Sequence, residues 1–143
     1  MYQSILLPVD ISEHELTVNA LKEAAYLMEK SQASLRLLYV ISTMPDYFLS
    51  HFSALTLQYE DTVTEDIKQQ LDIYAKSLTL PADRLTSNVR QGAIYDEILK
   101  EADEINAELI IIGSRRPSMS TYLLGSNAAA IVRHAKTSVL VVR

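Results

Sequence analysis

Short apolar runs alternate with segments of helical periodicity along the whole sequence. Two of these runs, Leu109–Ile112 and Ser138–Val142, carry no charged residue. A strand that is apolar on both faces is typical of a parallel sheet covered by helices on both sides. The alternation therefore predicts an α/β fold with a doubly wound parallel sheet, in which right-handed crossovers leave few topologies.

The expected elements follow from periodicity and from helix start and stop signals. We expect strands over residues 2–9, 35–41, 84–90, 109–112 and 138–142, with 84–90 nearer an edge. We expect a first helix that starts at Ser12 and Glu15, which have capping-box spacing, and runs to about Lys30. Further helices are expected over 63–78, ended by Pro81, from Gly92 onward, and over Asn127–His134. Residues 42–56 fit neither pattern, and we interpret them as an irregular cover with a short helical piece.

Composition narrows the possible classes of protein. The 143 residues are most simply one domain, 1–143, and contain no cysteine, which excludes disulfides and thiolate chemistry. A net charge of −5 argues against a nucleic-acid surface. No apolar run reaches membrane-spanning length and no basic leader precedes one, so we expect a cytoplasmic protein.

The segment from Gly113 to Asn127 is the strongest candidate for a binding site. It leaves the apolar strand at Gly113, continues through Arg115 and Arg116, and closes on Gly125-Ser126-Asn127 before an Ala-rich helix. Glycines permit close backbone approach, the first N–H groups of a helix attract anions, and arginine suits phosphate. The pattern indicates a phosphate cradle, although glycine and serine between a strand and a helix are also ordinary connector chemistry.

The position of this segment in the fold favours a site. Ligands of open parallel sheets bind beyond the carboxyl ends of the strands, where the winding direction reverses. With the first strand central, Asp10 at its exit and Gly113 at the exit of the fourth strand would meet there. Asp10 then contacts a ligand, or it only helps to start the first helix.

Other chemistry-bearing residues give weaker signals. His14 and His51 have no partner at metal-ligand spacing, and His134 suits a helix C-terminus. The apolar cluster from Tyr47 to Phe52 is typical of core or interface rather than of base stacking. No catalytic set can be assembled from spacing. The apolar last strand would be a hazard at a sheet edge, and either a second subunit or its own chain covers it.

The opening ILLPVD, the closing SVLVVR and the segment IIIGSRRPSMSTYLLGSNAAAIVRHA resemble the universal stress protein family over essentially the whole chain. The resemblance is strongest to the small bacterial members of the F and G types. It implies a five-stranded sheet in the order 3-2-1-4-5 with helices on both faces. It also implies a homodimer through the last strand, 138–142, and leaves open whether dimers pair into tetramers.

In the nucleotide-binding branch, the resemblance further implies ATP, with Mg²⁺ as a companion of the phosphates. The sequence motif of that branch is a glycine, any two residues, a second glycine, any nine residues, and a third glycine followed directly by serine or threonine. Here Gly113 and Gly125-Ser126 match, Arg116 replaces the middle glycine, and the second interval is one residue shorter. The residues carried over by position are Pro8, Val9 and Asp10 on the adenine and ribose side, Val40 at the base, and Gly113, Ser114, Arg115, Arg116, Gly125, Ser126 and Asn127 around ribose and phosphates.

Three functions remain open on the sequence. The first is an ATP-binding regulator of the stress response, and the second is a nucleotide-free dimeric interaction module, motivated by Arg116 in place of glycine. The third is a slow ATPase, for which spacing supplies only Asp10 and no second acid. We expect the first.

Overall fold

The computed structural model describes residues 1–11, 13–42, 53–114 and 126–143, and the side chains of 53–61 are outside the description. Its elements are β1 (Ser4–Pro8), α1 (His14–Glu29), β2 (Ser34–Ser42), α3 (Ser53–Ser77), the 3₁₀ turn η1 (Ala82–Arg84), β3 (Leu85–Gly92), α4 (Ile94–Glu104), β4 (Leu109–Gly113), α5 (Ser126–His134) and β5 (Ser138–Val142). The predicted alternation of strands and helices is confirmed, and β5 has the predicted bounds.

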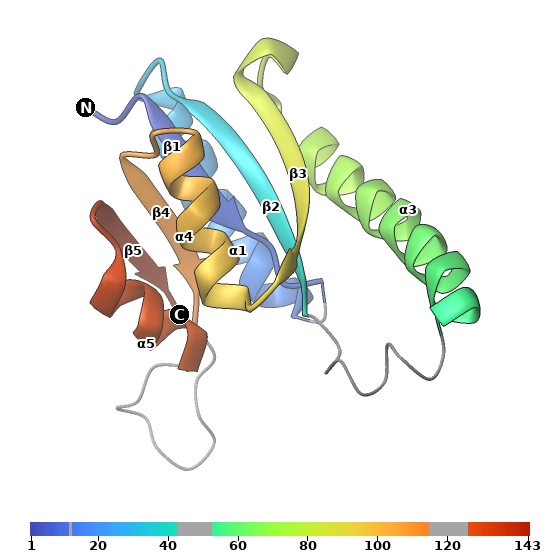
Figure 1. The fold of residues 1–143 in the computed structure, drawn as a ribbon. Helices are drawn as coiled ribbons and strands as arrows, with labels where there is room; N and C mark the ends of the chain where they lie inside the picture. The colour runs from blue at the N-terminus through green and yellow to red at the C-terminus, as the bar shows by residue number, and fades with distance from the viewer. Residues whose placement is uncertain (12, 43–52, 115–125) are drawn as a thin grey trace.

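The five strands form one parallel sheet in the order β3-β2-β1-β4-β5, as predicted. The central strand β1 pairs Leu7 with Leu37 of β2 on one side and Ile5 with Leu109 of β4 on the other. All the strands run in one direction, so their carboxyl ends lie at one edge, the lower edge of Figure 1, where α5 also begins. This arrangement is the one that places ligands at the ends of β1 and β4.

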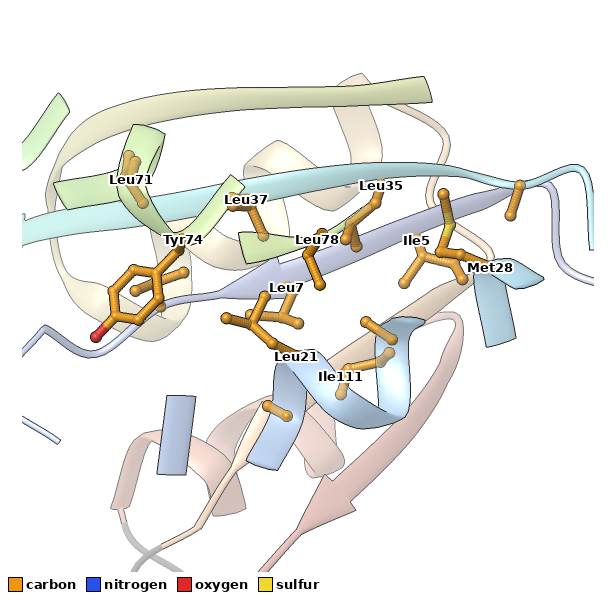
Figure 2. Close-up of a cluster of buried hydrophobic side chains, with 14 of the residues drawn as sticks. Ile5, Leu7, Leu21, Met28, Leu35, Leu37, Leu71, Tyr74, Leu78 and Ile111 are labelled. Carbon is orange, nitrogen blue, oxygen red and sulfur yellow. The ribbon is translucent and has the colours of Figure 1, made fainter. Parts of the chain in front are cut away.

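Each face of the sheet carries its own core. Helices α1 and α3 cover one face, where the side chains of Leu7, Leu37, Leu71 and Ile111 pack together in Figure 2. On the other face, α4 and α5 cover a smaller cluster that includes Ile110. Burial of apolar area on both faces is the main stabilising term for such a layered fold, at about 25 cal/mol per Å².

Two helix starts differ from the prediction. The capping box at Ser12 and Glu15 is wrong: α1 has Glu13 at its N-cap, with no side-chain cap hydrogen bond. The carbonyl of Asp10 instead accepts hydrogen bonds from Glu13 N at 3.1 Å and Thr17 Oγ1 at 2.8 Å. Ser12 itself lies outside the described residues.

Helix α3 begins at Ser53 rather than near Val63, so residues 53–56 belong to this long helix rather than to an irregular cover with a separate short helical piece. Apolar spacing is regular only from Val63 onward, which is why the sequence pattern missed the first turns. The stretch before it contains neither glycine nor proline to stop a helix. Residues 43–52 of the predicted cover, including the cluster from Tyr47 to Phe52, lie outside the described part of the chain.

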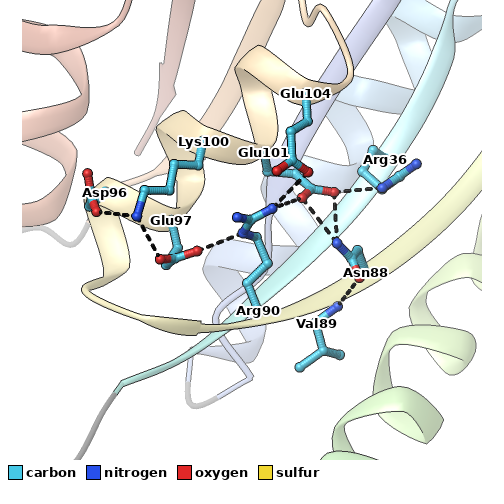
Figure 3. A network of polar contacts seen from close by, with 9 residues as sticks. All are labelled: Arg36, Asn88, Val89, Arg90, Asp96, Glu97, Lys100, Glu101 and Glu104. Carbon is cyan, nitrogen blue, oxygen red and sulfur yellow. Dashed lines mark hydrogen bonds and ion pairs between the residues drawn. The ribbon is translucent and has the colours of Figure 1, made fainter.

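A buried carboxylate fixes α4 to the sheet. Glu101 of α4 is fully buried and accepts hydrogen bonds from Arg36 Nη1 of β2 at 2.6 Å, from Asn88 Nδ2 of β3 at 3.1 Å and from Arg90 Nη1 of β3 at 2.9 Å (Figure 3). Burial raises the pKa of the Glu101 carboxyl, while these hydrogen bonds lower it, and the net pKa lies below the ordinary value. The network therefore holds the helix in one register against β2 and β3.

Candidate nucleotide site

A cavity of about 620 Å³ opens at the carboxyl ends of β1, β2 and β4. Its volume is within the range of small-molecule sites, which is about 300–1,000 Å³. Residues from all four described long helices contribute to its walls, among them Leu16 of α1, Val63 of α3, Ile94 of α4 and Asn127 of α5. The cavity therefore lies where the fold predicts a ligand.

Eight of the eleven residues named from the sequence line this one cavity. They are Pro8, Val9, Asp10, Val40, Gly113, Ser114, Ser126 and Asn127. Residues as far apart in sequence as Pro8 and Asn127 meet there because β1 and β4 are neighbours in the sheet. Arg115, Arg116 and Gly125 lie outside the described residues.

The backbone at the end of β1 holds Asp10 at the cavity. Val9 N donates to the carbonyl of Leu38 in β2 at 2.7 Å, which extends the pairing of the two strands by one residue. The next residue, Asp10, is exposed and uses its carbonyl at the start of α1. The main chain of Asp10 thus has the helix-starting role, and the residue also lines the cavity.

Gly113 packs against α1. A Cβ at this position would lie 3.3 Å from Leu16 Cβ and 3.7 Å from the Leu16 carbonyl oxygen. The absence of a side chain lets α1 approach the end of β4 closely. From the sequence, this glycine was predicted to let the backbone approach a ligand closely. The contact with Leu16 shows that it also has a packing role, which residue spacing in the sequence does not reveal.

The N-terminus of α5 faces the cavity through Ser126 and Asn127. The first N–H groups of a helix have no partner within it, and the helix dipole places a partial positive charge there. Among the described residues that line the cavity, Asp10 alone carries a charged side chain. An anion here would be held chiefly by backbone donors of the described residues.

The family model of the universal stress protein family matches residues 1–143. Universal stress protein G of Shigella flexneri is 36% identical over 143 residues, which cover 100% of both chains. The chain belongs to the universal stress protein family.

Solved structures of the family share the fold. Universal stress protein UspA from Lactobacillus plantarum superimposes with a TM-score of 0.74 at 26% identity, covering 99% of this chain and 98% of that one. A universal stress protein crystallised in complex with cAMP gives a TM-score of 0.67 at 24% identity, with 99% and 97% covered. The family member from Archaeoglobus fulgidus in complex with dAMP gives 0.66 at 18%, with 99% and 98% covered.

In this universal stress protein, the apolar walls of the cavity were not predicted as part of the site. Ile94 and Ile98 of α4, Ile112 of β4 and Ile131 of α5 form one side, and Val63 and Ile67 of α3 lie on the α3 side. The sequence had indicated Val63, Ile67, Ile94 and Ile98 only as apolar positions of helices, and Ile112 only as part of a buried strand. A flat aromatic ring is a suitable occupant for such walls, because its burial removes apolar surface from water.

Tyr39 is a second residue that the sequence did not single out. It lies in β2 one residue before Val40, is partly buried and lines the cavity. Burial, and then the negative charge of Asp10, raise the pKa of the Tyr39 phenol above its ordinary value. The side chain is therefore a neutral hydrogen-bond donor close to the Asp10 carboxylate.

His14 of α1 pairs with Tyr74 of α3 across the helix interface. His14 Nδ1 lies 2.9 Å from the Tyr74 hydroxyl, and the two rings stack at 5.8 Å. Over the residues that the structure describes, no group of three or more metal-ligating side chains is found. Nor does that part of the chain include a helix long and apolar enough to cross a membrane.

Proposed function

We propose that this universal stress protein binds ATP at the ends of β1, β2 and β4 and acts in the stress response as a nucleotide-dependent regulator. The observation that supports this function is the convergence of Asp10, Val40, Gly113 and Asn127 on one cavity of nucleotide size. The family members in complex with cAMP and with dAMP support an adenine nucleotide as the class of ligand.

The parts of the cavity match the parts of the ligand. The N-terminus of α5, with Ser126 and Asn127, suits phosphate, and the backbone of Val40 at the end of β2 suits the base. Asp10 follows β1, which lies between β2 and β4 in the sheet, so we assign it to the sugar. Arg115 and Arg116 would add charge-assisted contacts to the phosphates, as proposed from the sequence.

Magnitudes show that the helix N-terminus cannot act alone. It stabilises an anion by up to about 2 kcal/mol, whereas micromolar affinity requires about 8 kcal/mol. The remainder must come from burial of the base against the isoleucine walls and from hydrogen bonds to sugar and phosphates. A ligand with both a base and phosphates is therefore favoured over a simple anion.

Mg²⁺ fits this site only as a companion of the nucleotide. Mg²⁺ in nucleotide sites commonly binds through phosphate oxygens, water and one or two carboxylates. Among the described residues of the cavity, Asp10 is the one carboxylate. We propose that the phosphates rather than a protein cage would hold the ion.

Calorimetry on the full chain tests the function with three ligands: ATP, adenosine and tripolyphosphate. We expect ATP to bind at micromolar concentration and each fragment at least about tenfold more weakly, because each keeps only part of the contacts. No heat with millimolar ATP would reject the proposal. Tripolyphosphate binding as tightly as ATP would show an anion site without a purine slot.

We also propose that the protein is a homodimer through β5. This strand pairs only with β4 among the described strands, and four of its five residues are only partly buried. Such an apolar edge is stabilised when a second copy of the strand covers it. Light scattering after gel filtration should give twice the mass of the chain; a monomer at micromolar concentration would reject the dimer.

A further inference from the structure

Tyr39 and Asp10 place a hydrogen-bond donor and an acceptor beside one another in the wall of the cavity. Both residues line it: Tyr39 lies in the last part of β2, and Asp10 follows the neighbouring strand β1. The hydrogen bond from Val9 N to the carbonyl of Leu38 keeps these two strand ends together. Each of the two residues directly follows one partner of that bond.

The Tyr39 hydroxyl is available to a ligand. Within the described part of the chain, no hydrogen bond from this hydroxyl to another residue is found, although the side chain is partly buried. No buried side-chain oxygen of the described residues lacks a hydrogen-bond partner, so this hydroxyl is not sealed inside the core. In contrast, the hydroxyl of Tyr74 on α3 lies 2.9 Å from His14 Nδ1.

The pair is complementary to a group that both accepts and donates a hydrogen bond. An alcohol does so with one oxygen, which can accept from the phenol and donate to the carboxylate. In ATP such groups are the 2′ and 3′ hydroxyls of the ribose. The edge of adenine offers a donor and an acceptor as well, so position must decide between the sugar and the base.

Position favours the sugar. The phosphate end of the cavity lies at β4 and α5, and β1 is the strand next to β4. Neighbouring strands are about 4.8 Å apart, so Asp10 is one strand spacing from the phosphate end and Val40 of β2 is two. The ribose lies between the phosphates and the base in a nucleotide, as Asp10 lies between α5 and Val40.

We propose that Tyr39 and Asp10 together recognise the ribose hydroxyls, so that this protein selects ribonucleotides over dideoxynucleotides. Tyr39 is the specificity-determining residue, because it supplies a donor that Asp10 cannot. The inference rests on the proposed nucleotide binding.

Titration of the full chain with ATP and with 2′,3′-dideoxy-ATP tests the inference. The wild type should bind ATP about tenfold more tightly, since dideoxy-ATP lacks the hydroxyls that would bond to the Tyr39 phenol and the Asp10 carboxylate. Tyr39→Phe should weaken ATP binding by about five- to tenfold and leave dideoxy-ATP binding unchanged. Tyr26→Phe, at an exposed tyrosine of α1 away from the cavity, is the matched control and should change neither.

The remaining outcomes distinguish a failure of the sugar contact from a failure of the proposed function. Equal binding of both nucleotides by the wild type would overturn the sugar contact but not the proposed function. Equal weakening of both nucleotides by Tyr39→Phe would show a packing role for the ring. Inosine triphosphate tests contact with the base. If the wild type binds inosine triphosphate more weakly than ATP, but binds dideoxy-ATP as tightly as ATP, then Tyr39 and Asp10 contact the base rather than the sugar. Absence of binding by every nucleotide would reject the proposed function itself.

Discussion

A Cβ atom on Gly113 would lie 3.3 Å from the Cβ of Leu16, closer than side chains ordinarily pack. The end of β4 and the first turn of α1 are therefore in contact at the cavity. This contact ties the first helix to the strand exit from which the predicted phosphate loop departs.

Gly113→Ala should therefore lower the free energy of unfolding by about 1 kcal/mol, because α1 must move to admit a methyl group. In a Leu16→Gly background the same substitution should cost less, which a double-mutant cycle in urea will measure. If α1 moves without cost, the alanine will instead stabilise the protein by restricting the unfolded chain. That result would show that the close contact does not require glycine.

Asn127→Asp should have opposite effects on stability and on binding. A carboxylate in the first turn of α5 interacts favourably with the helix dipole, so the melting temperature should stay the same or rise. The same charge repels phosphates at that helix end and should weaken ATP binding by about tenfold. Asn19→Asp adds the same charge at an exposed position of α1 and should leave binding unchanged. Equal ATP affinity in the two variants would place the phosphates elsewhere.

Glu101→Gln should lower the free energy of unfolding by about 3 kcal/mol, because the guanidinium groups of Arg36 and Arg90 lose their buried carboxylate partner. Glu104 lies in the same helix, also contacts Arg90, and has a side chain that is 63% exposed. Glu104→Gln should therefore cost less than about 1 kcal/mol. Urea unfolding of both variants measures the contrast, and similar losses would argue against a special role for the buried carboxylate.

Acid should destabilise the protein through this network. Hydrogen bonds, chiefly from Arg90, lower the pKa of the Glu97 carboxyl, and the net pKa of Glu101 is also lowered. The folded state then binds protons less readily than the unfolded state. The stability that these carboxylates contribute is present above the ordinary glutamate pKa of 4.5 and is lost as the pH falls below it.

Urea unfolding between about pH 7 and pH 3 checks this dependence. The free energy of unfolding should fall less steeply with acid in Glu101→Gln than in the wild type, because one of the linked protons is removed. Parallel curves for the two proteins would mean that other carboxylates govern acid unfolding.

The layered fold could be predicted because its signals are local. An apolar run such as Leu109–Ile112 indicates a strand that is buried on both faces, and helical spacing indicates a helix with one buried face. Neither signal depends on which element packs against it. Right-handed connections leave few topologies, and the family resemblance supplied the strand order 3-2-1-4-5. The same reasoning brought Asp10 and Gly113 to one edge of the sheet, and the cavity between them is where the sequence led us to expect it.

What the sequence by itself determined is therefore the order of strands and helices, the strand exits and the polar residues that follow them. The tertiary structure alone decided that Glu101 is buried, that Gly113 packs on Leu16, and that Tyr39 lies beside Asp10 in the cavity wall. Each of these depends on which element packs against which, across separations such as the 65 residues between Arg36 and Glu101. Periodicity records only whether a side chain is turned inward, and carries no information on the partner that it meets there.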